Sequence, residues 1–152
     1  EIVVGVVKEL NRNELFYASK NNGAFLNGNK ISVSHTAKLS DSLIATGFPY
    51  YDFDLLDNYL SFFKYLMINT RGIRRLGSAA IDLCFTACGR FDAFFEYSLS
   101  PWDVAAGALI LKEAGGNIYD FKGENNWLHG KQILGSNPHI SEEILNLIKE
   151  KF

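Results

Sequence analysis

Two carboxylates near the middle of the chain, Glu96 and Asp103, are candidates for cation chemistry. Glu96 ends an aromatic run (FDAFFE) that is typical of a strand, and Asp103 opens a helical pattern after Pro101 and Trp102. A strand end and the start of the following helix lie on the same rim of an α/β sheet, so both carboxylates could face one pocket. A carboxylate at a helix start, as at Asp103, could bind Mg²⁺ through oxygen, although two-metal phosphoryl chemistry needs several acidic ligands. Spacing alone favours a simpler alternative, in which Asp103 caps its helix and Glu96 is a solvated charge.

A second candidate is the turn Gly77-Ser78-Ala79-Ala80, which joins a short strand to a helical pattern. Free backbone N–H groups at such a helix start can bind hydroxyl or phosphate oxygens. The structural alternative is a glycine turn with Ser78 as the helix cap. Arg74 and Arg75 precede the turn. They could bind a phosphate or a carboxylate, although a solvated strand edge or an ion pair at a subunit interface accounts for them more simply.

The elements that must position these residues begin with antiparallel hairpins. Strand patterns at residues 2–8, 14–19, 23–26 and 30–34 are separated by turns rich in Asn and Gly. We therefore expect residues 1–38 to form antiparallel strands of an N-terminal sheet and residues 39–152 to form a separate C-terminal α/β domain.

Strand and helix patterns alternate from residue 43 onward, which predicts a sheet with helices on its faces. The predicted fold class is α/β, with α+β character at the N-terminal edge. Strands are expected at 43–46, 72–76, 91–97, 117–121 and 131–135, and helices at 55–67, 78–88, 102–114 and from 141 onward.

The composition excludes several classes of protein. The chain has 152 residues, 47% of them hydrophobic, and a net charge of −2 with no block of basic residues, so no footprint for nucleic acid is expected. No apolar run is long enough to span a bilayer. Cys84 and Cys88 lie in apolar surroundings without histidine partners and are interpreted as core residues. Because no disulfide framework is indicated, we expect a cytoplasmic location.

Taken together, these segments resemble the inositol monophosphatase family. Trp102 to Gly107 (WDVAAG), followed by Glu113 to Gly116 (EAGG), is similar to its C-terminal signature. Gly77 to Leu83 (GSAAIDL) resembles its substrate-side turn and helix, and Gly23 to Gly28 (GAFLNG) its second hairpin. The order and spacing agree along essentially the whole chain. The resemblance implies a layered sheet-and-helix sandwich of the sugar phosphatase type, here incomplete.

The resemblance also implies roles for particular residues. Asp103 matches a ligand of an active-site Mg²⁺, and Glu96 matches a glutamate that binds inositol hydroxyls. Gly77, Ser78 and Ala79 match the turn that contacts the sugar ring. Thr46-Gly47-Phe48 matches a loop near the site. No catalytic residue is assigned within this chain.

The family's other metal ligands lie in an N-terminal segment with a DPxDGT motif, which no stretch here resembles. The chain opens with Glu1 directly before a strand-like run, so we expect that part of the parent protein precedes it. The implied function is the C-terminal portion of a Mg²⁺-dependent phosphate monoester hydrolase acting on inositol monophosphate or a similar polyol or sugar phosphate, inactive as an isolated chain. Alternatives are fructose-1,6-bisphosphatase, 3′-phosphoadenosine phosphate phosphatase, or a non-catalytic binding module. The parent protein is expected to be a homodimer that binds neither nucleic acid nor membrane.

Overall fold

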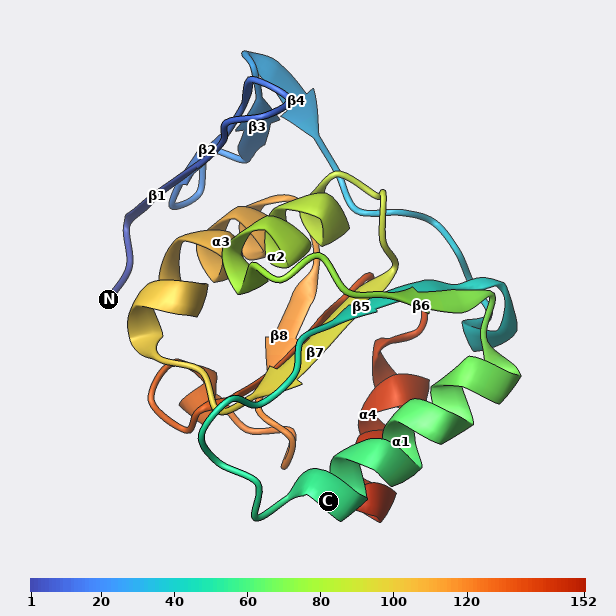
Figure 1. Ribbon diagram of the computed structural model, residues 1–152. Coiled ribbons are helices and arrows are strands. Elements are labelled where there is room, and N and C mark those ends of the chain that lie inside the picture. Colours follow the sequence, from blue (N-terminus) through green and yellow to red (C-terminus); the bar gives the residue numbers. More distant parts are fainter.

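The computed structural model describes residues 1–152 and places the chain in four layers: sheet, helices, sheet, helices (Figure 1). The N-terminal sheet has the order β1-β2-β3-β4, and the second sheet has the order β6-β5-β7-β9-β8. The strands are β1 (Val4–Glu9), β2 (Glu14–Ser19), β3 (Ala24–Leu26), β4 (Asn29–Ile31), β5 (Leu43–Thr46), β6 (Gly72–Arg74), β7 (Ala93–Tyr97), β8 (Asn117–Tyr119) and β9 (Gln132–Ser136). The α-helices are α1 (Leu56–Asn69), α2 (Ala79–Ala87), α3 (Pro101–Glu113) and α4 (Ser141–Lys151).

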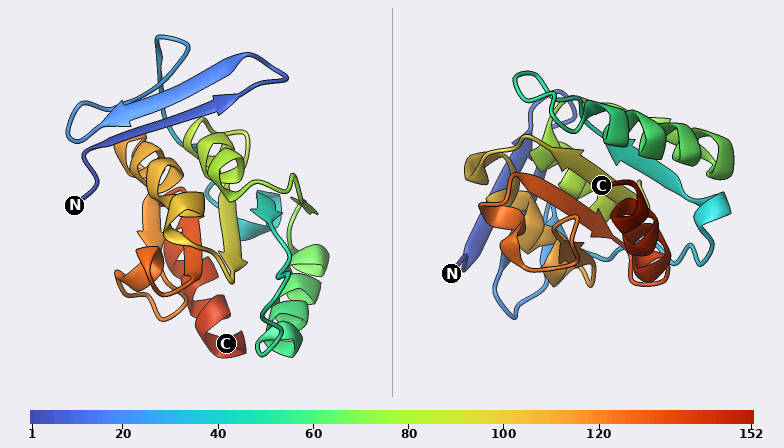
Figure 2. Two further views of the ribbon diagram at one scale, coloured as in Figure 1. Left: turned by 60° about the vertical axis from the view of Figure 1, so that its left-hand side comes forward. Right: turned by 90° about the horizontal axis from the view of Figure 1, so that it is seen from below.

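The N-terminal sheet is an antiparallel meander, as its turn residues predict. Asn13, Asn21, Asn27 and Gly28 all adopt positive φ at or next to its turns, a conformation that Asn and Gly tolerate better than other residues. Each strand pairs with the next, with Val6 opposite Tyr17 and Tyr17 opposite Phe25. The sheet lies across α2 and α3, on the far side of these helices from the second sheet (Figure 2).

The second sheet is mixed. Strands β6, β5 and β7 are parallel, and β9 runs antiparallel between β7 and β8. The alternation of side chains along β7 divides the hydrophobic core. Phe94 faces α2 and α3 in one buried cluster, whereas Ala93, Phe95 and Tyr97 belong to a second cluster with α1 and α4. The α/β fold class with its antiparallel N-terminal part is therefore confirmed.

Two strands end earlier than their sequence patterns suggest. β8 stops at Tyr119 because the buried Asp120 carboxylate accepts the backbone N–H groups of Lys122 and Glu124 at 2.9 and 2.8 Å, which turns the chain. β6 stops at Arg74, so Arg75 lies outside the sheet. None of the helices combines the length and apolarity that a bilayer crossing requires.

Candidate active site

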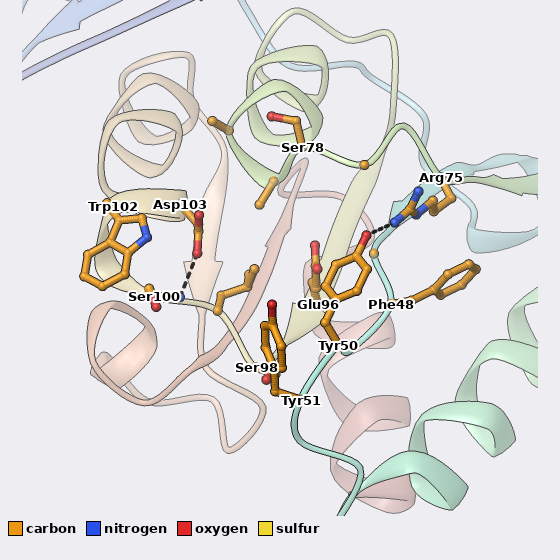
Figure 3. A pocket seen from close by; sticks show the side chains of 15 residues that line it. Phe48, Tyr50, Tyr51, Arg75, Ser78, Glu96, Ser98, Ser100, Trp102 and Asp103 are labelled. Carbon is orange, nitrogen blue, oxygen red and sulfur yellow. Dashed lines mark hydrogen bonds between the residues drawn. The ribbon is translucent and has the colours of Figure 1, made fainter.

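A pocket of about 520 Å³ lies where the carboxyl ends of β5 and β7 meet the N-terminal ends of α2 and α3 (Figure 3). This volume is in the range of small-molecule sites. All five residues for which the sequence predicts a binding role line it: Gly77, Ser78, Ala79, Glu96 and Asp103. They come together because parallel strands and the helices that follow them present their ends at one edge of the sheet.

Asp103 is the third residue of α3, and its carboxylate serves the helix and faces the pocket at the same time. One oxygen, Oδ2, accepts the backbone N–H of Ser100 at 2.9 Å, which fixes the side chain at the helix start. The other oxygen, Oδ1, has no hydrogen-bond partner within the chain. The helix cap that spacing alone favours is therefore present, and it leaves one carboxylate oxygen free to bind a ligand.

Glu96 is buried at the end of β7, with 8% of its surface exposed. Its carboxylate packs so closely against Gly47 that a Cβ at that position would lie 2.1 Å from the Glu96 Cδ, so only glycine fits there. Burial raises the pKa of Glu96 to about 8, and the neighbouring carboxyl group of Asp82 adds to the rise. The sequence alternative of a solvated rim charge is wrong for Glu96, because the β5 end covers it.

Asp82 is a titratable group that the sequence does not single out. It lies one turn after Ser78 on α2 and is fully buried, and neither carboxylate oxygen has a hydrogen-bond partner. Burial raises the pKa of Asp82 to about 7, while the charge of Arg75 opposes the rise. Asp82 and Glu96 therefore form a pair of buried carboxyl groups beneath the pocket that cannot both be ionised at low cost. In the sequence, Asp82 is a single acidic residue within an otherwise apolar helix pattern (AAIDLCF), and this exception could have identified it.

The Gly77 turn presents the start of α2 to the pocket. Gly77 adopts φ +92°, a region that other residues avoid, and this turn directs the chain from β6 into the helix. Ser78 occupies the N-cap position but its hydroxyl makes no capping hydrogen bond. The exposed hydroxyl of Ser78 is therefore free for a ligand, in contrast to the simple cap that the structural alternative assumes.

The loop after β5 forms the other wall of the pocket. The hydroxyl groups of Thr46 and Tyr59 are hydrogen-bonded to each other at 3.0 Å, and the Tyr59 hydroxyl donates to the Gly47 carbonyl at 2.9 Å. Because Tyr59 lies on α1, this helix fixes the carboxyl end of β5. Burial raises the pKa of Tyr59 to about 12, which keeps its hydroxyl protonated as a donor. Phe48, Tyr50 and the nearly fully exposed Tyr51 continue this wall.

Among the residues that the sequence left open, Arg75 lines the pocket and Arg74 does not. Cys84 is fully buried and Cys88 is half-buried, and both are free thiols, so their interpretation as core residues is confirmed. No three His, Cys, Asp or Glu side chains lie close enough together to form a metal site. Asp103 has the chemistry of a Mg²⁺ ligand and a free oxygen, but a second and third ligand do not come from its surroundings in this chain.

The chain is similar to known proteins over nearly its whole length. The model of the inositol monophosphatase family matches residues 1–151. A Nus factor SuhB of Pseudomonas aeruginosa is 45% identical over 146 residues, which is 95% of this chain and 54% of that protein. The chain spans about half the length of the curated relatives it matches.

Two solved structures share the fold. An inositol monophosphatase from Anabaena (Nostoc) sp. PCC 7120 is 38% identical with a TM-score of 0.89, over 97% of this chain and 59% of that one. An extragenic suppressor protein suhB from Bartonella henselae is 39% identical with a TM-score of 0.93, over 99% of this chain and 57% of that one.

Proposed function

Because the chain belongs to the inositol monophosphatase family, we propose that it forms the substrate-binding wall, and supplies one metal ligand, of a Mg²⁺-dependent phosphatase that hydrolyses phosphate monoesters of small polyols or sugars. One observation carries the proposal. A single pocket brings together the free carboxylate oxygen of Asp103, the buried carboxyl group of Glu96 and the open start of α2.

Asp103 would hold Mg²⁺ through Oδ1 while Oδ2 stays bonded to the Ser100 N–H, so helix α3 would fix the ligand in place. Bound Mg²⁺ supplies Lewis-acid stabilisation of the phosphate charge and lowers the pKa of bound water. The further ligands of such a site are proposed to come from the part of the relatives that this chain does not match.

Glu96 and the turn at the start of α2 would orient the substrate. The carboxyl group of Glu96 can accept hydrogen bonds from ring hydroxyls, and its burial makes each such bond stronger than in water. The Ser78 hydroxyl and the backbone N–H groups at the helix start are donors for hydroxyl or phosphate oxygens. Orientation of this kind contributes to catalysis by holding the ester in a reactive position.

Two variants of the full-length protein test these roles separately, with inositol 1-phosphate as substrate. Asp103→Asn keeps an oxygen for the Ser100 N–H but removes the charge, so we expect the Mg²⁺ concentration for half-maximal activity to rise at least tenfold. Glu96→Gln should raise KM about 10- to 100-fold with little change in the Mg²⁺ requirement. The roles would be misassigned if the Mg²⁺ requirement followed Glu96 instead of Asp103.

Inositol monophosphate is the proposed substrate because a buried carboxyl group suits a polyol ring. Fructose 1,6-bisphosphate and 3′-phosphoadenosine phosphate are the alternatives, and kcat/KM for the three compounds decides among them. A homodimeric state, a cytoplasmic location, the lack of a nucleic-acid partner and the division into residues 1–38 and 39–152 remain predictions.

A second function is favoured by one observation: relatives with 39% and 45% identity carry the name Nus factor SuhB, and one with 47% identity the name putative Nus factor SuhB. We propose a Nus factor role as the alternative to catalysis. Replacing the Pseudomonas aeruginosa relative with this protein and with its Asp103→Asn variant tests it. Equal restoration of growth by both would support a role that does not need phosphatase chemistry, and restoration by neither would reject it.

A further inference from the structure

Arg75 is a single basic side chain in a pocket whose other charged residues are acidic. Of the 15 residues that line it, Arg75 is the only basic one, and the other charged residues are Glu96 and Asp103. The chain contains two ion pairs, Lys20 with Glu1 and Arg90 with Glu14, and neither involves Arg75. Within this chain the Arg75 guanidinium therefore makes no ion pair, although its charge acts at longer range on the carboxyl groups of Asp82 and Glu96. The structure leaves it available to a ligand.

Aromatic side chains hold this guanidinium at the pocket wall. Arg75 donates a hydrogen bond to the Tyr50 hydroxyl, and its Cζ lies 5.2 Å from the ring centre of Phe48 and 5.9 Å from that of Tyr50. It also lies against Gly77, where a Cβ would be 3.1 Å from Nη1. Stacking on aromatic faces restricts the side chain without neutralising its charge, and the guanidinium keeps further N–H donors for a ligand.

Arg75 lies across the pocket from Asp103, where the end of a substrate opposite its reacting phosphate would lie. Asp103 and Arg75 project from opposite sides of the pocket, and Glu96 lies between them (Figure 3). A monoester whose reacting phosphate lies at Asp103 and whose hydroxyls meet Glu96 would direct its other end toward Arg75. A neutral group there leaves the cation unpaired, whereas an anionic group forms a charge-assisted, bidentate pair.

We propose that Arg75 and Tyr50 form a subsite for a second anionic group of the substrate, remote from the phosphate that is hydrolysed. The inference rests on the proposed phosphatase function. It adds a preferred class of substrates to inositol monophosphate, namely polyol or sugar phosphates that carry a second phosphate or a carboxylate at the far end. Tyr50 contributes as a positioning residue by fixing the guanidinium plane.

Matched substrates test the subsite in the full-length protein. Fructose 1,6-bisphosphate and fructose 1-phosphate differ only in a far phosphate, and 6-phosphogluconate and glucitol 6-phosphate differ in a far carboxylate. In at least one pair, we expect kcat/KM to be about 10- to 100-fold higher for the compound with two anionic groups. The pair that shows the preference identifies phosphate or carboxylate as the preferred group.

Variants assign the preference to the residues. Arg75→Gln should reduce the ratio within the pair to near one, Arg75→Lys should restore part of it, and Tyr50→Phe should lower it severalfold through KM. Arg74→Gln, next to the pocket but outside it, is the control and should keep the ratio. Equal kcat/KM within both wild-type pairs, or a ratio that survives Arg75→Gln, would overturn the subsite.

Two further measurements distinguish a ligand-binding role of Arg75 from a role in subunit contacts. Fructose 6-phosphate retains only the far phosphate, so its binding measured by calorimetry without Mg²⁺ should weaken at least tenfold in Arg75→Gln. This result would hold even if the protein hydrolysed none of the monoesters, in which case the phosphatase proposal alone fails. A change of oligomeric state in Arg75→Gln by light scattering, with binding of fructose 6-phosphate unaffected, would instead place Arg75 at a subunit interface and overturn the subsite.

Discussion

At the scale of single residues, the buried acids Asp82 and Glu96 dominate the electrostatics of the site. Asp82 has no hydrogen-bond partner and is fully buried, so ionising it places a charge where water cannot reach it. Glu96 is covered by Gly47 and exposed only toward the pocket, so its charge is poorly solvated. Such groups occur at functional sites because a ligand or a cation can later compensate the charge. Until that happens, the buried carboxyl groups make the stability of the fold depend on pH.

The contribution of Asp82 to the free energy of unfolding should fall as pH rises, because the folded state raises the pKa of Asp82 from 3.8 to about 7. A raised pKa means that the folded chain binds more protons than the unfolded chain between these two values, so this contribution is lost through that window and stays lost above it. Asp82→Asn should remove this dependence and gain on the order of 4 kcal/mol relative to wild type between about pH 4 and pH 8.

Urea unfolding of both proteins at several pH values provides the measurement. Asp41→Asn, at an exposed carboxylate without hydrogen bonds, is the matched control and should run parallel to wild type. Parallel wild-type and Asp82→Asn profiles would show that the Asp82 carboxyl is not desolvated as the structure has it.

At the scale of elements, one carboxylate connects α3 to the N-terminal sheet. Glu113, in the last turn of α3, accepts the backbone N–H groups of Asn21 and Gly23 at 2.8 and 2.9 Å. These bonds hold the turn between β2 and β3, and they lower the pKa of Glu113. Because α3 carries Asp103 at its other end, the same helix joins the sheet and the site.

Removing this connection should weaken the contact between the two layers. Glu113→Ala leaves two N–H groups without their acceptor and should lower the free energy of unfolding by about 1–3 kcal/mol at neutral pH. Glu113→Gln, which keeps one acceptor oxygen, should lose less. The lowered pKa means that the wild-type advantage is present above the ordinary Glu pKa and fades as the pH falls below it.

Thermal or denaturant unfolding measures the loss at Glu113, and Glu150→Ala, an exposed helix residue without such bonds, is the control. Hydrogen exchange at Asn21 and Gly23 locates the effect, because their amides should exchange faster in Glu113→Ala. An unchanged exchange rate at both amides would mean that Glu113 does not hold this turn in solution.

At the scale of the whole molecule, the two sheets enclose α2 and α3, and the pocket lies at one end of these layers. The chain contains one candidate Mg²⁺ ligand in this pocket and no cluster of three metal-binding side chains. Phosphoryl transfer assisted by metal ions requires several ligands around the cations.

The 152-residue chain alone should therefore show no turnover of inositol 1-phosphate with Mg²⁺ above the background rate, whereas the full-length protein should be active. A phosphate-release assay on both proteins at one Mg²⁺ concentration makes the comparison, and a reaction without protein gives the background rate. Clear turnover by the 152-residue chain that Asp103→Asn abolishes would contradict the idea that ligands outside this chain are needed.

The sequence by itself determined the order and type of the elements, since periodicity and turn residues are local properties. It also placed Glu96 at a strand end and Asp103 at a helix start, and the fold brings such ends to one edge. Only the tertiary structure decided that Glu96 is buried, that Asp82 lies unpartnered below it and that Arg75 reaches the pocket and not the sheet edge. These properties depend on which distant segments cover a side chain, such as Gly47 over Glu96 and Tyr50 beside Arg75. Desolvation and pairing are set by those neighbours, and spacing along the chain does not specify them.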